Sequence, residues 1–293
     1  MQHLITADDF SIEQINNILQ NASRFKNNGN PPALLRDKLL FTLFFENSTR
    51  TRSSFEVAAK KLGAAVVHLD PSKSSTAKGE TIEDTFANLG AMAPDGVIIR
   101  HASNEIPQTL ADMDMAPVIN AGAGNYAHPT QALLDLFTLQ EHFGSLEGKR
   151  VAIVGDIANS RVASSAISLL PRFGVEVSLV APAPFMPTDT KLAKYDKIED
   201  IIDKVDVIMS LRAQLERHQT PIFEDYETYA SHYCITPQTL GNRDIIIMHP
   251  GPVMRNIDIS DEVLADHRCK VLTQVTNGVF VRMAVLKMLL LDS

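Results

Sequence analysis

The sequence predicts an α/β protein composed of two doubly wound parallel-sheet domains that are joined by long helices. Three features predict this class of fold: short apolar runs alternate with helical segments, the alternation starts again near residue 150, and the chain has 293 residues. Strands that alternate with helices form parallel sheets with crossover helices. A chain of this length can build the core of one large or two ordinary domains.

The first half of the chain alternates four apolar runs with helical segments. The runs predicted as strands are residues 39–45, 64–69, 96–100 and 117–120. The segments predicted as helices are residues 48–62, 81–91 and 128–143. The helix at 128–143 is rich in leucine and phenylalanine, and we expect it to bridge the two domains.

The second half repeats this order. The predicted strands are residues 150–155, 175–180, 205–210 and 244–248, and the predicted helices are residues 162–173 and 278–291. The polar segment 211–242 is predicted as a loop, and loops of this length are usually functional or mobile. We therefore expect one domain of residues 1–130, completed by a C-terminal helix at 278–293, and a second domain of residues 131–277.

Charge and composition exclude several classes of protein. The net charge of −8 argues against a nucleic-acid partner or an anionic membrane surface, which both require clustered Lys and Arg. The two cysteines, Cys234 and Cys269, predict neither a disulfide framework nor a metal site. The most apolar stretch, 279–291, contains Arg282 and Lys287 and is too short to span a bilayer. Since the N-terminus also lacks a secretory signal, we expect a cytoplasmic protein without a membrane partner.

The strongest chemical signal follows the first predicted strand, where residues 45–52 read Phe-Glu-Asn-Ser-Thr-Arg-Thr-Arg. The free N–H groups at the start of a helix favour an anion, and hydroxyls and guanidinium groups add donors for phosphate oxygens. Ser48, Thr49, Arg50 and Thr51 are therefore candidate phosphate ligands. The alternative is an ordinary helix cap with a solvated basic turn, although positive charge there opposes the helix dipole.

Several motifs, in order along the chain, resemble those of the aspartate/ornithine carbamoyltransferase family. Residues 45–51 are similar to its carbamoyl phosphate signature. The other matching segments are Lys78-Gly79-Glu80-Thr81 (a mobile loop), Arg100-His101 (a strand end), His128-Pro129-Thr130-Gln131 and His249-Pro250-Gly251-Pro252. The resemblance covers essentially the whole chain. It implies a first domain that binds carbamoyl phosphate and a second domain that binds the acceptor amino acid.

The resemblance also implies a role for each matching residue. Ser48, Thr49, Arg50, Thr51 and Arg100 would hold the phosphate group. His128 would donate to the carbamoyl oxygen, together with Arg100 and Thr51, because negative charge develops there when the amine attacks. For His128 alone, a structural histidine is the alternative. The acceptors for the carbamoyl NH₂ would be Gln131 and the backbone carbonyls of Pro250 and Gly251. The family often has Leu in place of Gly251, but only the backbone is needed.

The acceptor is predicted from the strand end at residues 206–214. There Arg212 and Gln214 resemble the Arg-x-Gln of the aspartate enzymes, which grips the carboxylates of aspartate. Ornithine enzymes instead have an Asp-containing segment and a Cys-Leu-Pro loop, whereas this chain has Pro250 without a cysteine. A dicarboxylate needs cations to hold it, so Arg212 and Arg161 indicate aspartate. For Arg161 alone, a surface position at a helix start is the alternative.

The implied reaction belongs to pyrimidine biosynthesis and uses no metal, cofactor or covalent intermediate. The substrates would be carbamoyl phosphate and L-aspartate. Lys78 would touch both ligands from the loop 72–79, which the family places in the active site of the adjacent subunit. A homotrimer with shared active sites is therefore expected. A regulatory chain or a dihydroorotase as a further partner is left open.

Three alternatives remain at this point. The first is a transcarbamoylase for another acceptor. The second is a nicotinamide-dependent oxidoreductase, suggested only by the second α/β domain. Residues 155–160 lack the G-x-G-x-x-G pattern that a dinucleotide loop requires. The third is an inactive scaffold of the same fold, which retention of all the motif residues argues against.

Overall fold

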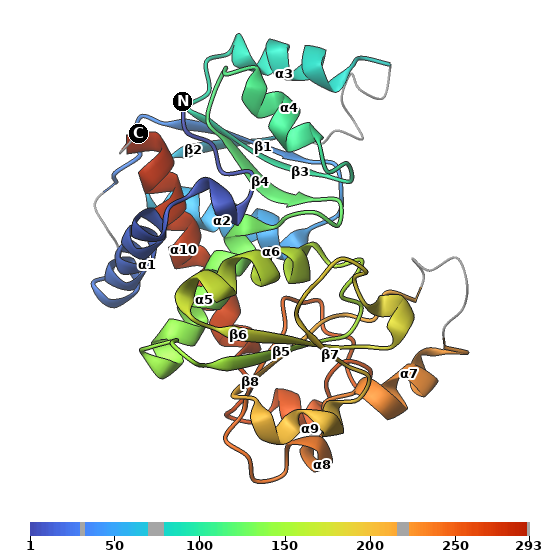
Figure 1. The fold of residues 1–293 in the computed structure, drawn as a ribbon. Coiled ribbons are helices and arrows are strands. Elements are labelled where there is room, and N and C mark those ends of the chain that lie inside the picture. The colour runs from blue at the N-terminus through green and yellow to red at the C-terminus, as the bar shows by residue number, and fades with distance from the viewer. Residues whose placement is uncertain (30–32, 70–78, 216–222, 292–293) are drawn as a thin grey trace. The chain divides into compact units, whose positions relative to one another are not determined.

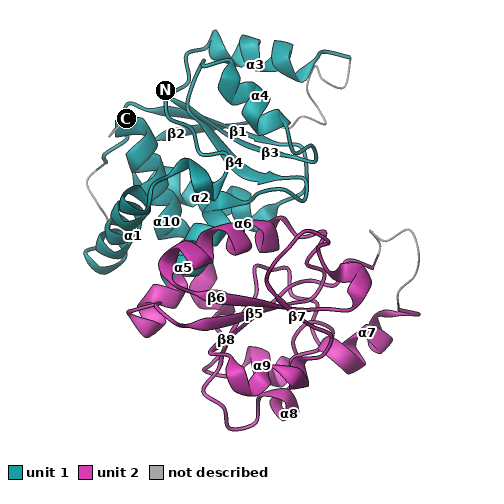
Figure 2. Ribbon diagram, viewed as in Figure 1, with its two compact units in different colours: residues 1–137, 275–293 teal, residues 138–274 magenta. Residues whose placement is uncertain are grey.

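The computed structural model describes residues 1–29, 33–69, 79–215 and 223–291. These form two compact units, one of Met1–Phe137 with Val275–Ser293 and the other of Thr138–Gln274 (Figure 2). The unit boundaries fall inside helices α5 (Pro129–Phe143) and α10 (Val271–Leu291). Both helices therefore run from one unit into the other, as the predicted fold class requires.

The first unit contains a four-stranded parallel sheet in the order β2-β1-β3-β4 (Figure 1). Its strands are β1 (Leu39–Phe44), β2 (Ala65–Leu69), β3 (Gly96–His101) and β4 (Val118–Ala123). Its other helices are α1 (Ile12–Asn27), α2 (Thr49–Lys61), α3 (Ile82–Gly90) and α4 (Ile106–Asp112). β4 is buried along its whole length, while the edge strand β2 is partly exposed. Parallel strands that are buried on both faces have nearly continuous apolar sequences, and this explains the composition of β1, β3 and β4.

The second unit contains a five-stranded parallel sheet in the order β7-β6-β5-β8-β9. Its strands are β5 (Arg150–Val154), β6 (Glu176–Val180), β7 (Ala193–Tyr195), β8 (Val207–Ser210) and β9 (Ile246–Met248). Its helices are α6 (Arg161–Leu169), α7 (Tyr226–Tyr233), α8 (Pro237–Leu240) and α9 (Asp261–Leu264). The two parallel-sheet domains that the sequence predicts are thus confirmed.

Each sheet has one point where the strand order reverses. In the first unit the chain goes from β1 outward to β2 and then returns to β3 on the other side. In the second unit it goes from β5 to β6 and β7 and then returns to β8. Ligands of open α/β sheets bind outside the carboxyl ends of the strands at such reversals. The loops that follow β1, β3, β5 and β8 are therefore the places to look for a site.

The structure corrects the predicted loop at 211–242, because α7 and α8 both lie within this range. Asp225 caps α7 by accepting from the Thr228 N–H, and Thr236 caps α8 with Pro237 at its first position. Tyr229 and Tyr233 of α7 stack on each other with ring centres 5.2 Å apart. This aromatic packing, rather than a clear helical periodicity, stabilises the segment.

Besides α7 and α8, the sequence does not predict the helices α1, α4 and α9 or the strand β7. α1 has recognisable signals, because Ser11 and Gln14 form a capping box and Ile15, Ile18 and Leu19 are buried on one face. The last helix also begins earlier than predicted, at Val271 rather than Gly278. Gly278 therefore lies inside a helix and does not mark its start.

α10 is long and apolar enough to cross a membrane by length and composition alone. However, 67% of its apolar window is buried inside the protein. A mostly buried core helix passes the same test, so this one helix is weak evidence for a membrane span.

Candidate active site

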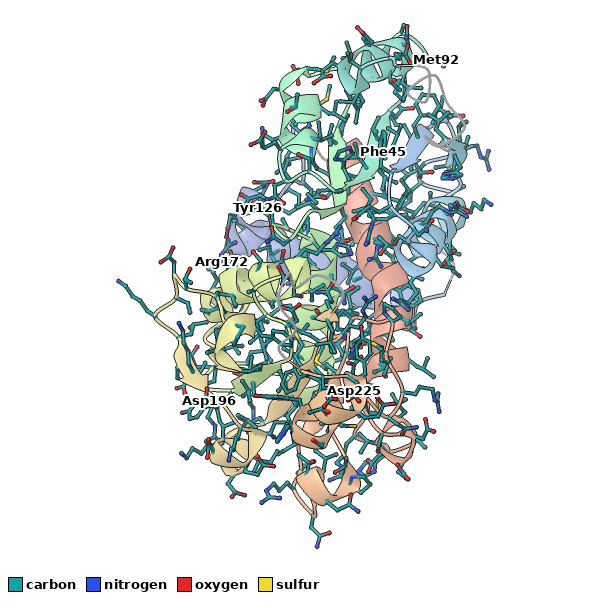
Figure 3. All side chains as sticks on the ribbon, turned by 90° about the vertical axis from the view of Figure 1, so that its right-hand side faces the viewer. Phe45, Met92, Tyr126, Arg172, Asp196 and Asp225 are labelled. Atoms are coloured by element: carbon teal, nitrogen blue, oxygen red, sulfur yellow. The ribbon has the colours of Figure 1, made fainter. Side chains whose placement is uncertain are left out.

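The loops after β1 and β3 meet at the reversal point of the first sheet. Phe44 is paired with Arg100 in the strand register, and the Phe45 N–H donates to the Arg100 carbonyl over 2.9 Å. Phe45, labelled in Figure 3, also meets the His101 ring edge-on with ring centres 4.9 Å apart. The segment that carries the predicted phosphate ligands therefore starts directly beside the end of β3.

The side chain of Arg100 forms hydrogen bonds with two side chains of this segment. Its Nε donates to Glu46 Oε2 over 3.2 Å, and its Nη1 donates to Ser48 Oγ over 3.3 Å. Ser48 occupies the N-cap position of α2, but within the described structure its hydroxyl accepts from Arg100 and does not cap the helix. The first N–H groups of α2 thus have no side-chain cap, and an anion would satisfy them.

Thr49 and Arg50 form the first exposed turn of α2, which contains no acidic residue. Although its side chain reaches the surface, neighbouring atoms desolvate Arg50 enough to lower its pKa from the ordinary value. A guanidinium remains charged at neutral pH after such a shift. Among the residues that the structure describes, no carboxylate forms an ion pair with Arg50. Its charge is therefore available to an anionic ligand.

His128 lies directly before α5 and faces the same turn of α2. Its Nε2 is 3.5 Å from Thr51 Oγ1, and the two residues are only 4% and 8% exposed. A buried imidazole and a buried hydroxyl thus lie together one turn from Ser48. The structure brings the four predicted residues Ser48, Thr51, Arg100 and His128 into one cluster. Donors of this kind can stabilise negative charge on a carbonyl oxygen.

Gln131 lies in the first turn of α5 and is 7% exposed. Its Nε2 donates to Asp135 Oδ1 over 2.9 Å. Because a carboxylate only accepts hydrogen bonds, this contact determines that the NH₂ side of the amide faces Asp135. The amide oxygen of Gln131 is therefore the atom that remains to accept from a ligand.

In the second unit, the loops after β5 and β8 meet at the reversal point of the second sheet. Gly155 follows β5 with a φ of +122°, and a Cβ there would lie 2.8 Å from the Leu211 carbonyl oxygen. Gln214 Nε2 donates to the Asn159 carbonyl over 3.4 Å. Only a glycine allows this close approach of the two loops.

Arg161 occupies the first turn of α6, where Ser160 caps the helix by accepting from the Ala163 N–H. The alternative of a surface arginine is wrong, because Arg161 is only 8% exposed. Arg212 is half-buried and is the second residue after β8. Two partly desolvated cations therefore belong to the adjoining loops after β5 and β8, and Gln214 bonds to the β5 loop itself.

The loop after β9 is organised by a buried pair, His249 and Asp258, whose side chains are both 0% exposed. His249 Nδ1 accepts from the Gly251 N–H over 2.8 Å, so the proton of the neutral ring is on Nε2, which donates to Asp258 Oδ2 over 3.2 Å. Gly251 has a φ of +70°, a conformation that suits glycine. The backbone at Pro250 and Gly251 is thereby held in place.

Asp258 also accepts from two backbone groups, the Met254 N–H over 2.8 Å and the Ala213 N–H over 3.1 Å. Ala213 lies between Arg212 and Gln214. One buried carboxylate therefore holds both the loop that carries the predicted aspartate ligands and the loop that carries Pro250 and Gly251. The sequence reasoning missed Asp258, because no local pattern links it to Ala213.

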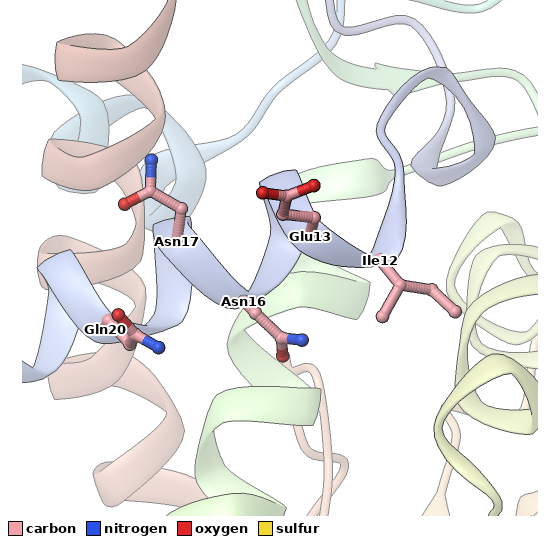
Figure 4. Close-up of a pocket in the computed structure, with 5 residues that line it drawn as sticks. All are labelled: Ile12, Glu13, Asn16, Asn17 and Gln20. Atoms are coloured by element: carbon pink, nitrogen blue, oxygen red, sulfur yellow. The ribbon is translucent and has the colours of Figure 1, made fainter.

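Lys78 lies outside the described residues. The hollow shown in Figure 4 is on the outer face of α1 and contains none of the predicted site residues. Its lining residues are Ile12, Glu13, Asn16, Asn17 and Gln20. Within the described ranges, no group of three or more His, Cys, Asp and Glu side chains could hold a metal ion.

Two family models match the chain over nearly its full length. The carbamoyl-P binding domain of aspartate/ornithine carbamoyltransferases matches residues 2–141, and the Asp/Orn binding domain of the same enzymes matches residues 147–289. The chain belongs to the aspartate/ornithine carbamoyltransferase family. The family resemblance predicted from the sequence motifs is thus confirmed.

Individual relatives in this family are similar over the whole chain. The aspartate carbamoyltransferase catalytic subunit of Sulfurovum sp. (strain NBC37-1) is 71% identical over 100% of this chain and 99% of the relative. That of Sulfurimonas denitrificans is 59% identical over 100% of both chains.

Solved structures show the same similarity. The catalytic subunit of M. jannaschii aspartate transcarbamoylase has a TM-score of 0.90 at 35% identity, covering 100% of this chain and 99% of the other. Aspartate transcarbamoylase from Trypanosoma cruzi, in complex with carbamoyl phosphate and aspartate, has a TM-score of 0.89 at 32% identity. The alignment covers 97% of this chain and 95% of that one.

Proposed function

We propose that this member of the carbamoyltransferase family transfers the carbamoyl group of carbamoyl phosphate to the amine of L-aspartate. The products are N-carbamoyl-L-aspartate and phosphate, in de novo pyrimidine biosynthesis. The observation that carries the proposal is the placement of cations at the reversal points of both sheets. Arg50 and Arg100 lie at the first, and Arg161 and Arg212 lie at the second. Both substrates are anions, and each reversal point suits one of them.

Carbamoyl phosphate binds to the first unit. Its phosphate group accepts hydrogen bonds from the uncapped N–H groups of α2, from the hydroxyls of Ser48 and Thr49, and from the Arg50 guanidinium. Binding also gives Arg100 an anionic partner in place of Glu46. The carbamoyl NH₂ donates to the amide oxygen of Gln131 in this unit.

The aspartate amine attacks the carbamoyl carbon, and negative charge develops on the carbamoyl oxygen in the tetrahedral intermediate. Thr51, Arg100 and His128 donate to that oxygen, which lowers the barrier because the donors are already in place. The C–O bond to phosphate then breaks, and phosphate departs. The phosphate dianion takes the proton of the amine, so no dedicated base is required.

Aspartate binds to the second unit. Its two carboxylates are held by Arg161 and Arg212, and Gln214 adds a hydrogen bond. Ornithine would instead need an anion for its side-chain ammonium group. The buried carboxylate of Asp258 already accepts from three donors. Asp156 is 0% exposed and accepts from Asn159. The charges at this site therefore favour the dicarboxylate.

The proposal is tested by the product. The purified chain is incubated with carbamoyl phosphate and either L-aspartate or L-ornithine at equal concentration, and both ureido products are quantified. We expect carbamoyl aspartate to form at least about a hundredfold faster than citrulline, because an unpaired charge on either side is costly in a partly buried site. Equal rates, or citrulline alone, would overturn the proposed acceptor.

We also propose a homotrimer in which Lys78 of one subunit completes the site of its neighbour. The support is the resemblance of residues 78–81 to the mobile loop of the family. A test is to dissociate Arg50→Ala and Lys78→Ala subunits, mix them in equal amounts and reassociate them. In a cyclic trimer each mixed ring contains one site with both residues intact, so activity should return to roughly a quarter of the wild-type value. No recovery in confirmed hybrids would exclude the shared site. A cytoplasmic location is part of the same proposal, and cell fractionation tests it.

A further inference from the structure

A buried carboxylate lies directly behind Gln131 on α5. Asp135 is one helical turn further along and is 0% exposed. It accepts the Gln131 Nε2 hydrogen bond over 2.9 Å. Residues four positions apart on a helix are neighbours on one face, so α5 itself sets this geometry. Asp135 has no place in the reaction described above, although it contacts a side chain that does.

Asp135 shares its surroundings with a buried cation of α10. Arg282 is 3% exposed, donates from Nη1 to Ser54 Oγ over 2.9 Å, and has its guanidinium 5.1 Å from the centre of the Phe55 ring. Burial lowers the pKa of Arg282 to about 10, while the charge of Asp135 acts in the opposite direction. Arg282 therefore remains cationic at neutral pH and places a positive charge in the surroundings of Asp135.

The position of Arg282 explains the glycine inside α10. A Cβ at Gly278 would lie 2.6 Å from Arg282 Nη1 and 3.1 Å from Leu134 Cδ2. Glycine in a helix interior costs about 1 kcal/mol relative to alanine. The chain has glycine at this position because a larger residue would displace the guanidinium from Ser54. Gly278 and Arg282 of α10 thus pack against Leu134, the residue of α5 that precedes Asp135, and against Ser54 of α2.

We propose that Asp135 is a positioning residue that fixes the amide of Gln131 for the carbamoyl group. This inference rests on the proposed function, in which Gln131 accepts from the carbamoyl NH₂. A glutamine amide has two orientations of nearly equal shape, and the wrong one would place NH₂ against NH₂. Because a carboxylate only accepts, Asp135 selects the orientation with Oε1 toward the ligand. The arrangement therefore favours carbamoyl phosphate over acyl phosphates that lack the amide.

The test compares carbamoyl phosphate with acetyl phosphate, in which a methyl group replaces the NH₂. The variant replaces both charges, Asp135→Leu with Arg282→Met, because removing only one would leave an uncompensated buried charge. We expect kcat/KM for carbamoyl phosphate to fall about five- to tenfold, as for the loss of an oriented hydrogen bond. The inhibition constant of acetyl phosphate for the variant, measured by competition with carbamoyl phosphate, should stay within about twofold of the wild-type value. When Gln131→Ala is added to this variant, kcat/KM for carbamoyl phosphate should fall less than a further twofold. The reason is that Asp135 and Gln131 act through one contact.

Arg282→Lys is the matched control, because it retains a cation opposite Asp135 and leaves the acceptor of Gln131 in place. It should keep the wild-type ratio between the two phosphates. If the doubly substituted chain does not fold, Asp135→Asn provides a second route, because it keeps the shape of the side chain; the stability lost through the unbalanced charge is measured separately by urea unfolding. Because the Asn amide can present its NH₂ to Gln131, the same selective loss is expected.

Two results would overturn the inference. One is an equal loss for carbamoyl and acetyl phosphate, which would make Asp135 merely structural. The other is additive losses when Gln131→Ala is combined with the variant, which would place its effect elsewhere. Neither result would contradict the proposed function, which is contradicted only if the wild-type chain forms no carbamoyl aspartate.

Discussion

The two units build their candidate sites in different ways. In the first unit, side chains of α2, β3 and α5 contact one another directly, as in the Arg100–Ser48 and Thr51–His128 pairs. In the second unit, one buried carboxylate, Asp258, holds the backbone of two loops that carry the predicted ligands. The first design places several donors at one helix start and suits a compact phosphate group. The second design makes ligand placement depend on loop geometry, which allows different acceptors to be selected on the same fold.

The largest effect is expected at Arg50 of the first unit. Arg50→Ala removes the proposed charged contact to the phosphate group, which we expect to strengthen as charge develops in the transition state. Turnover should fall by at least about 2–3 kcal/mol, or about 30- to 160-fold. Steady-state kinetics of the folded variant measure this loss.

Arg52→Ala is the matched control on the same helix. Arg52 lies near Glu56 and His68, with its Nε 3.6 Å from Glu56 Oε1. Its loss should change turnover less than about twofold, as expected for a solvent-exposed ion pair. Near-normal activity of Arg50→Ala, or equal losses in both variants, would remove the phosphate assignment.

An intermediate effect is expected at Asp258 of the second unit. Asp258→Asn turns one NH₂ toward a backbone N–H or His249, so one buried donor loses its acceptor. The free energy of unfolding should fall by about 1–3 kcal/mol, and kcat/KM should fall about tenfold for both substrates. Urea unfolding and steady-state kinetics measure the two effects.

The exposed Asp261 at the start of α9 provides the comparison, because it holds Arg255 and Asn256 at the surface. Asp261→Asn should leave the kinetics unchanged. If Asp258→Asn retained the activity of the wild type, the loops would not depend on this carboxylate.

The smallest effect is expected at Asp266, which lies in the second unit but outside both loops. Hydrogen bonds from Arg268 lower the pKa of Asp266 to about 2. Because the folded pKa lies below the unfolded one, this contribution to stability is present above about pH 4 and is lost as the pH falls toward 2.

Asp266→Asn should therefore cost less than about 1 kcal/mol at pH 7, as expected for a pair near solvent. The difference from the wild type should narrow as the pH is lowered from 5 toward 3, and activity should not change. A pH-independent difference would show that Asp266 contributes through packing instead of charge.

The sequence predicts most of the strands and the helix start that carries the candidate phosphate ligands. Buried parallel strands are almost continuously apolar, and hydroxyl and guanidinium groups after such a strand are a local signal. Both features can be predicted from the sequence because they depend only on residues that are neighbours in the chain.

The remaining features depend on contacts between distant segments. Asp258 and Ala213 are 45 positions apart in the chain, and Arg282 reaches Ser54 across 228 positions. The sequence places a helix start at Gly278, because nothing in the local pattern indicates that this glycine packs against Arg282. Within 211–242, α7 depends on aromatic packing around Tyr229, which no local period indicates.

The most direct test of the division between the two units is a pair of measurements on Arg212→Ala. Carbamoyl phosphate is titrated against the variant and the wild type, and the KM for aspartate is measured at saturating carbamoyl phosphate. Our account predicts that carbamoyl phosphate binding changes less than about twofold, while kcat/KM for aspartate falls at least about tenfold, as for the loss of a charged contact. Equal weakening of both ligands would contradict it, because Arg212 would then support the fold instead of selecting the acceptor.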